Sequence, residues 1–172
     1  VGYVVFIGDL VHGVGVYSGQ EEDSNIHDVK LQFDEFTEYV KQIPKHIQVI
    51  LITGNHDPVR LQEPQPPVYQ DHAPELYEME NVHVLSNPSV VNIEETQDSS
   101  GLNMLLYHGY SLIYYAKEVQ PLKDAGGLTA TQEIMKFLLK KRHLAVTHGS
   151  NTYVPDPEED PLAIVDVPDV MV

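Results

Sequence analysis

Four residues that can bind a metal ion stand at the ends of aliphatic runs in the sequence: Asp9, Asn55, His56 and His108. Carboxylate oxygen, amide oxygen and imidazole nitrogen suit a hard or borderline divalent ion such as Mn²⁺, Mg²⁺, Fe²⁺ or Zn²⁺. An aspartate can bridge two such ions, which together clamp a phosphodiester and lower the pKa of a bridging water for attack on phosphorus. A histidine beside the ions can protonate the leaving oxygen.

Each of these residues has a second interpretation when it is taken alone. Gly8-Asp9 is also typical of a turn or a helix cap, and His108 of a hydrogen-bonded histidine at a strand end. Gly-Asn-His-Asp directly after an aliphatic run is more specific. The three segments in this order therefore predict a divalent metal site.

The elements around these residues predict how they come together. Residues 3–8 and 47–53 are continuous apolar runs, as in strands buried on both faces. Between them, apolar residues from Val29 to Ile43 recur at spacings of three and four, which predicts a helix that Pro44 ends. A strand, helix and strand in this order form a βαβ unit with parallel strands, so Asp9 and the Gly-Asn-His-Asp segment should leave the same sheet edge.

The rest of the chain predicts a mixed α/β fold without a domain boundary. We expect an irregular loop over residues 58–78 with a helical turn near Leu76, and two short strands around a turn at Asn87-Pro88. Further expected elements are a strand at 103–109, a helix over 128–144 that opens with a Thr129–Gln132 capping box, and a final strand at 162–167.

The composition limits the function classes. The chain has 172 residues, no cysteine and a formal net charge of −16. Disulfides, thiolate zinc sites and cysteine nucleophiles are thus excluded, and no apolar run reaches the roughly 18 residues that cross a bilayer. We expect an intracellular protein without a membrane partner. Its acidity reflects either a solvated surface, such as an adaptation to salt, or a dependence on metal ions or a basic partner for contact with nucleic acid.

Several strings resemble a known family. "GDLVHG", "GNHD" and "YHGY" are similar to motifs two, three and four of the calcineurin-like metallophosphoesterases. "GVGVYSGQEED", "GNHDPVRLQEPQP", "MKFLLKKRHLA" and "VPDV" resemble, over nearly the whole chain, the small subunit of the archaeal D-family DNA polymerase. The resemblance implies a metallophosphoesterase β-sandwich flanked by helices (αββα). It also implies a 3′→5′ proofreading exonuclease that uses a divalent metal, two Mn²⁺ ions or similar, acts on a single-stranded DNA 3′ end in the archaeal cytoplasm and associates with a large polymerising subunit.

The resemblance also implies roles for individual residues. Asp9 matches the bridging aspartate of motif two, and His108 the metal ligand of motif four. Asn55 matches the asparagine that binds the second metal and faces the phosphate, and His56 the histidine that stabilises the transition state or protonates the leaving group. Asp57 is expected to orient His56 through a ring nitrogen.

Two further residues keep two interpretations each. Arg60 either meets a phosphate or forms a structural ion pair. His12 stands where repair nucleases of the superfamily carry a histidine, and it either approaches the substrate or is an ordinary loop residue. For His148 we expect a structural role, because no comparable aliphatic run precedes it.

Two motifs of the family are not in this sequence. Asp-x-His would precede Val1, and Gly-His-x-His would follow Val172. Because these motifs supply about half of the family's metal ligands, the chain is either a fragment cut at both ends or a protein with an incomplete site. We expect residues 1–172 to be a fragment of a single exonuclease domain, with low activity by itself. The alternatives are a catalytically inactive scaffold that binds the polymerase large subunit, and a phosphomonoesterase of the same superfamily.

Overall fold

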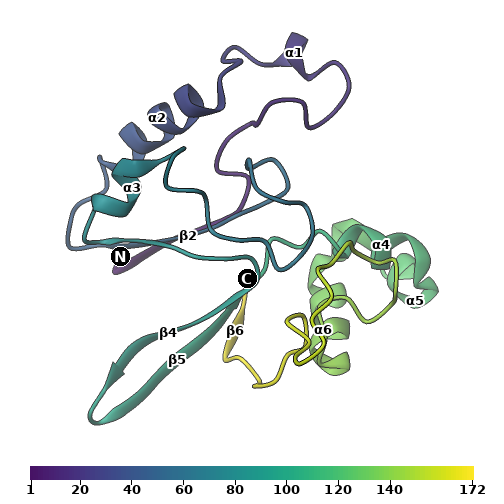
Figure 1. Ribbon diagram of the computed structural model, residues 1–172. Helices are drawn as coiled ribbons and strands as arrows, with labels where there is room; N and C mark the ends of the chain where they lie inside the picture. The colour runs from purple at the N-terminus through teal and green to yellow at the C-terminus, as the bar shows by residue number, and fades with distance from the viewer. The chain divides into compact units, whose positions relative to one another are not determined.

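The structure is mixed α/β and contains two separate three-stranded sheets. The computed structural model describes residues 1–172 and divides into two compact units (Figure 1). The first unit comprises residues 1–60 and 65–89, and the second comprises residues 61–64 and 90–172. No helix is long and apolar enough to span a bilayer.

The first unit is built on a parallel sheet, as the sequence predicts. Strands β1 (Tyr3–Ile7), β2 (Gln48–Ile52) and β3 (Val82–Val84) lie in the order β1-β2-β3. Strands β1 and β2 pair in register over their whole length, from Tyr3 opposite Gln48 to Ile7 opposite Ile52. Val49 to Ile52 of the central strand are buried, which explains the continuous apolar run.

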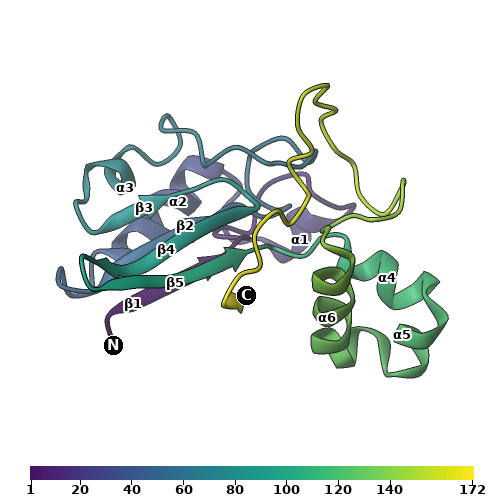
Figure 2. The same ribbon diagram turned by 90° about the horizontal axis from the view of Figure 1, so that it is seen from below.

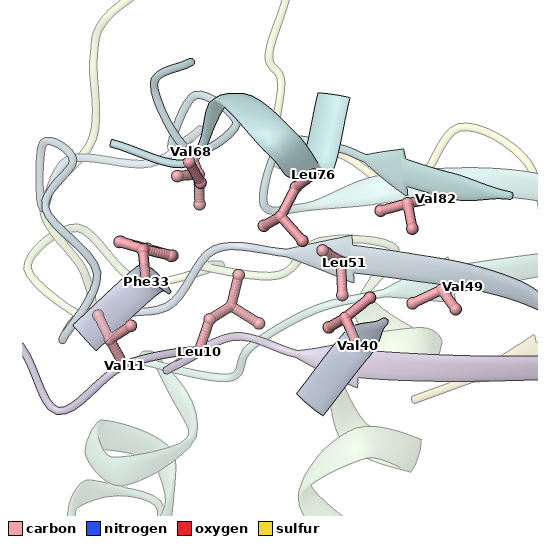
Figure 3. Packing of buried hydrophobic residues seen from close by; sticks show 10 residues of the cluster. Leu10, Val11, Phe33, Val40, Val49, Leu51, Val68, Leu76 and Val82 are labelled. Carbon is pink, nitrogen blue, oxygen red and sulfur yellow. The ribbon is translucent and has the colours of Figure 1, made fainter. Parts of the chain in front are cut away.

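Helix α2 (Val29–Val40) supplies the apolar face of this unit. Asp28 caps the helix, because its carboxylate accepts a hydrogen bond from the backbone amide of Leu31 at 3.0 Å. Phe33 and Val40 are buried against strand residues in the cluster of Figure 3. The short helices α1 (Gln20–Asp23) and α3 (Pro74–Glu78) complete the unit, and α3 is the helical turn expected near Leu76.

The second unit combines a small sheet with a helical part. Strands β4 (Ser89–Thr96), β5 (Ser99–Leu106) and β6 (Val170–Met171) lie in the order β4-β5-β6, with β5 and β6 parallel. Helices α4 (Leu112–Glu118), α5 (Gln120–Asp124) and α6 (Thr131–Lys141), with the 3₁₀ turn η1 (Gly127–Ala130), form the rest. Their core contains the fully buried side chains of Tyr115, Ile134 and Leu138.

Two local predictions for the second unit are wrong. Residues 162–167 are not a strand: the backbone of Leu162 and Ile164 bonds to Leu144 and Arg142, just after α6, and both side chains join a buried cluster. The strand that pairs with β5 is β6 instead. The expected capping box is also missing, because α6 begins without a side-chain cap and the Thr129 hydroxyl donates to the Gly126 carbonyl at 2.9 Å.

Candidate metal centre

The loops that follow β1 and β2 meet, as the βαβ arrangement predicts. Because Ile7 lies opposite Ile52, Asp9 and the Gly54–Asp57 segment leave the same edge of the sheet. The backbone amide of His56 donates a hydrogen bond to the Asp9 Oδ1 at 2.9 Å. Asp9 has a φ of 50°, a left-handed conformation that aspartate tolerates better than most residues, and its side chain is exposed.

The imidazole of His56 is held in one tautomer by the loop after β1. Its Nδ1 lies 2.9 Å from the carbonyl oxygen of His12. Since a carbonyl oxygen only accepts, Nδ1 carries the proton, and Nε2 is the ring nitrogen that remains for a reaction. The same carbonyl accepts a second hydrogen bond, from the Gln20 Nε2 at 2.7 Å, which fixes its position.

A close approach of two backbone segments brings His12 and His56 together. A Cβ atom at Gly13, where φ is 74°, would lie 2.3 Å from the His56 carbonyl oxygen. Only glycine therefore fits this position without displacing the loop. The two imidazole rings lie 6.0 Å apart between centroids, and His12 is exposed.

Tyr17 completes this group of rings, although it was not predicted from the sequence. Its hydroxyl lies 3.2 Å from the His12 Nε2 and donates to Asp23 at 3.2 Å, while its ring lies 6.2 Å from that of His56. Partial burial and the hydrogen bond to Asp23 raise the pKa of the Tyr17 hydroxyl. In the sequence, Gly13 and Gly15 were the signal that could have pointed to Tyr17, because these glycines indicate a loop that folds back on itself.

Asp57 has a different role from the predicted one. It is only 3% exposed, and its carboxylate accepts hydrogen bonds from the backbone amides of Leu10 at 2.9 Å, Val11 at 3.3 Å and Gly54 at 2.7 Å. It therefore ties the loop after β1 to the end of β2 and does not bond to the His56 ring. Burial raises the pKa of Asp57 to about 6, although the three amide donors favour the carboxylate.

Arg60 is the last residue of the first segment, residues 1–60, of the first unit. Its side chain is exposed, and its carbonyl oxygen accepts a hydrogen bond from the Gln65 Nε2 at 3.1 Å. The two predicted roles of Arg60, a phosphate contact or a structural ion pair, both stay predictions.

The second unit holds His108 at the end of β5, next to a buried hydrogen-bond network. His108 is half-buried and follows Tyr107, whose hydroxyl donates to the Glu63 Oε2 at 3.1 Å and lies 2.9 Å from the Ser111 Oγ. The Ser111 hydroxyl donates in turn to the Leu144 carbonyl at 2.6 Å. Burial, followed by the charge of Glu63, raises the pKa of Tyr107 well above its usual range.

Glu63 is the centre of this network and was not selected from the sequence. It is 1% exposed and also accepts a hydrogen bond from the Asn151 side-chain amide. Its backbone is fixed as well, because its amide donates to the Thr152 carbonyl and its carbonyl accepts from the Val154 amide. A glutamate among prolines gives no periodic signal, so nothing in the local sequence indicated its burial.

The types of donor fit the expected metal ions. Asp9 and Asn55 in the first unit would supply carboxylate and amide oxygen, and His108 in the second an imidazole nitrogen. No group of three or more histidine or carboxylate side chains in the structure is placed to hold an ion by itself. Each unit by itself would thus supply only part of a coordination shell.

Comparisons with known proteins agree on one family. A family model that describes the DNA polymerase alpha/epsilon B-subunit matches residues 3–172. The chain is 41% identical over 170 residues to the DNA polymerase II small subunit of Halobacterium salinarum, which covers 99% of this chain and 32% of that protein. The chain is 38% identical to the DNA polymerase II small subunit of Methanothermobacter thermautotrophicus, in a match that covers 99% of this chain and 33% of that protein. It is 36% identical to the subunit of Pyrococcus furiosus, in a match that covers 99% of this chain and 26% of that protein. The chain thus spans about a quarter to a third of the length of these relatives.

Proposed function

Because the chain belongs to the DNA polymerase alpha/epsilon B-subunit family, we propose that it forms part of a metal-dependent 3′→5′ exonuclease in the small subunit of an archaeal DNA polymerase. The observation that carries the proposal is the arrangement of His56. Its backbone amide bonds to the Asp9 carboxylate, and its Nδ1 proton is held by the His12 carbonyl.

This arrangement gives the residues separate tasks. Asp9, Asn55 and His108 are the residues that would bind the metal ions. Two bound Mn²⁺ ions, or similar ions, would polarise the phosphodiester and lower the pKa of a water molecule. The Nε2 of His56, when protonated, would donate its proton to the departing 3′ oxygen, because Nδ1 is already engaged.

Two further expectations belong to the proposal. The fold would be the αββα type of the metallophosphoesterases within one exonuclease domain, and the protein would act in the cytoplasm. The net charge of −16 fits a division of labour in which metal ions bind the scissile phosphate and a large polymerase subunit makes most contacts to DNA.

A catalytically inactive scaffold is the second candidate function. It is favoured by the absence of any three converging histidine or carboxylate ligands in the structure. Against it, the four candidate site residues are all present, whereas a decayed site would be expected to lose some of them: Asp9, Asn55, His56 and His108. The similarity to polymerase subunits makes a phosphomonoesterase the weakest of the three candidates.

The test compares His56→Ala with His46→Ala, a matched control at an exposed histidine, in the whole natural protein. We expect the wild type and the control to degrade 3′-labelled single-stranded DNA with Mn²⁺. The His56 variant should lose about 10²–10⁴-fold in rate, as loss of a general acid does, and keep its metal content by mass spectrometry. Intact DNA with a metal-free wild type would favour the scaffold, and equal loss of metal and activity would refute the role of His56.

A further inference from the structure

The loop between β1 and α1 presents apolar side chains to solvent beside the proposed catalytic histidine. This loop, residues 8–19, is drawn purple in Figures 1 and 2. Within it, Val14 is 48% exposed, Val16 36% and Tyr17 42%. The centroid of the Tyr17 ring lies 6.2 Å from that of His56. Exposed apolar side chains that gather in one place, next to a reactive group, indicate a binding surface.

Two buried glutamines hold this loop in its shape. The Gln20 Oε1 accepts a hydrogen bond from the Val16 backbone amide at 2.8 Å, and its Nε2 donates to the His12 carbonyl at 2.7 Å. The Gln32 Oε1 accepts from the Gly13 backbone amide at 2.8 Å, and its Nε2 donates to the Gly13 carbonyl at 3.1 Å. Both glutamines are buried, so the exposed loop is fixed from beneath. Little order therefore has to be gained when a ligand binds to it.

The ring of Tyr17 is fixed through its hydroxyl. Because a carboxylate only accepts, the hydroxyl donates its single proton to the Asp23 Oδ2 at 3.2 Å. The Tyr17 oxygen then accepts from the His12 Nε2, also at 3.2 Å. Neither neighbouring imidazole stacks on the tyrosine ring, since the planes of His12 and His56 are inclined to it by 66° and 51°. Tyr17 is thus a held, partly exposed aromatic ring on which a flat group can stack.

The charge of the surrounding segments selects the part of DNA that this loop can bind. Neither residues 1–29 nor residues 46–59, which carry the candidate residues of the first unit, contain a lysine or arginine. Proteins bind the DNA backbone mainly through such cations, so these segments would contact bases instead of phosphates. Nucleobases stack on aromatic side chains with little dependence on their identity. This tolerance suits an exonuclease, which has to remove any of the four nucleotides.

We propose that Tyr17 binds the DNA substrate by stacking on one of the two bases that flank the scissile phosphate, with Val14 and Val16 extending the apolar surface. The inference rests on the proposed function and adds how the single-stranded 3′ end is held. If His56 protonates the departing 3′ oxygen, the bases on either side of that oxygen are the ones within reach of a ring 6.2 Å away. A base is favoured over a protein segment because the platform adjoins His56, where the DNA lies during cleavage.

The first experiment measures kcat and KM of the whole natural protein on 3′-labelled single-stranded DNA with Mn²⁺. Tyr17→Leu removes the ring and keeps an apolar side chain, whereas Tyr17→Phe keeps the ring and loses only the hydroxyl. The matched control is Tyr69→Leu, because Tyr69 is also an exposed tyrosine of the first unit beside a histidine, with its ring centroid 6.3 Å from that of His72.

The second experiment does not depend on cleavage. DNA that carries 5-iodouracil in place of either of its last two bases is irradiated with the His56→Ala protein, which should bind the DNA without cutting it. This base forms ultraviolet crosslinks to aromatic side chains that stack on it, and mass spectrometry identifies the crosslinked residue. DNA with 5-iodouracil far from the 3′ end is the control.

We expect Tyr17→Leu to raise KM about 5–100-fold, the range that loss of one base–aromatic stack gives, and to change kcat by less than about twofold. Tyr17→Phe should recover most of the affinity, and Tyr69→Leu should stay within about twofold of the wild type. A base at the 3′ end should crosslink to Tyr17, and a base far from it should not.

Three results would overturn the stacking role: degradation of DNA with an unchanged KM in Tyr17→Leu, the absence of a crosslink at Tyr17, or equal losses in the test and control variants. A Tyr17→Leu protein that loses affinity for the purified large subunit and not for DNA would overturn it too, because the loop would then be a protein contact. A crosslink at Tyr17 together with a wild type that leaves DNA intact would instead support the stacking and refute the proposed exonuclease.

Discussion

The two compact units support their candidate ligands in different ways. In the first unit, Asp57 stands in the same short motif as Asn55 and His56, and its carboxylate bonds to backbone amides of both neighbouring loops. In the second unit, His108 follows a tyrosine whose hydroxyl partner, Glu63, is 44 residues away, and Glu63 is also bonded to Asn151, 88 residues away. Both supports join segments far apart in the chain, but the supporting carboxylate stands within the motif in the first unit and in a distant segment in the second. Each of the following changes tests one side of this comparison.

Glu63→Ala should give the largest effect. It leaves the buried Asn151 amide without its acceptor, the Tyr107 hydroxyl with the Ser111 Oγ as its one acceptor, and a cavity in place of the buried side chain, which together should cost about 3–5 kcal/mol. Hydrogen exchange followed by mass spectrometry should show lost protection in residues 90–172 and little change in the first unit. The control Glu133→Ala removes only a surface ion pair with Lys136 and should cost less than about 0.5 kcal/mol. Equal loss of protection in both units would contradict the separation of the two supports.

Asp57→Ala should destabilise the first unit by about 2–3 kcal/mol at neutral pH, because three backbone amides lose their acceptor. Exchange at Leu10, Val11 and Gly54 should quicken, whereas Asp34→Ala, at an exposed helix position, should leave it unchanged.

The same variant should reveal a pH dependence. The pKa of Asp57 is raised to about 6 in the folded chain, above the ordinary 3.8, so the folded state binds this proton more tightly than the unfolded state. The stabilisation by the bound proton is complete below the unfolded pKa and is lost as the pH rises through 6. Chemical denaturation of the metal-free chain should thus show a cost of Asp57→Ala that is about 1–2 kcal/mol larger at pH 5 than at pH 7.5. A cost that grows with pH would contradict the direction of the shift.

Gly13→Ala tests the close approach of the loops at His56. A left-handed φ together with a Cβ at 2.3 Å from a carbonyl oxygen should cost about 2 kcal/mol and reduce the nuclease activity of the whole protein. Gly15→Ala is the matched control, because Gly15 has a φ of 73° but no atom within 4 Å of the added Cβ. It should cost only the backbone strain, about 1 kcal/mol. Similar activities of the two variants would show that the close approach does not position His56.

Gln132→Ala should have the smallest effect. A capping box would make this change cost about 1 kcal/mol, but the Thr129 amide bonds to the Gly126 carbonyl and α6 has no side-chain cap. Thermal unfolding should therefore shift by less than about 1 °C. A decrease of several degrees in the unfolding temperature would indicate that the capping box predicted from the sequence does form.

The sequence predicts the first unit better than the second, for a physical reason. Its strands and α2 are marked by periodic apolar residues, and the parallel connection follows from their order, so the meeting of Asp9 with the Gly54–Asp57 segment could be predicted. The partners of Asp57 could not be predicted, because they are backbone amides, and the sequence does not show which backbone amide binds a buried carboxylate. Glu63 and Asn151 are polar residues in irregular segments, and only the folded chain shows that they are buried together.

The assignment of residues 61–64 to the second unit limits how this protein can be divided. The chain passes between the units three times, at residues 60–61, 64–65 and 89–90. No single cut yields two self-contained halves, and a fragment that ends before residue 90 would carry Glu63 without the tyrosine and asparagine that it binds. An engineer who isolates the first unit as residues 1–89 would have to redesign residues 61–64, because their partners lie beyond residue 90.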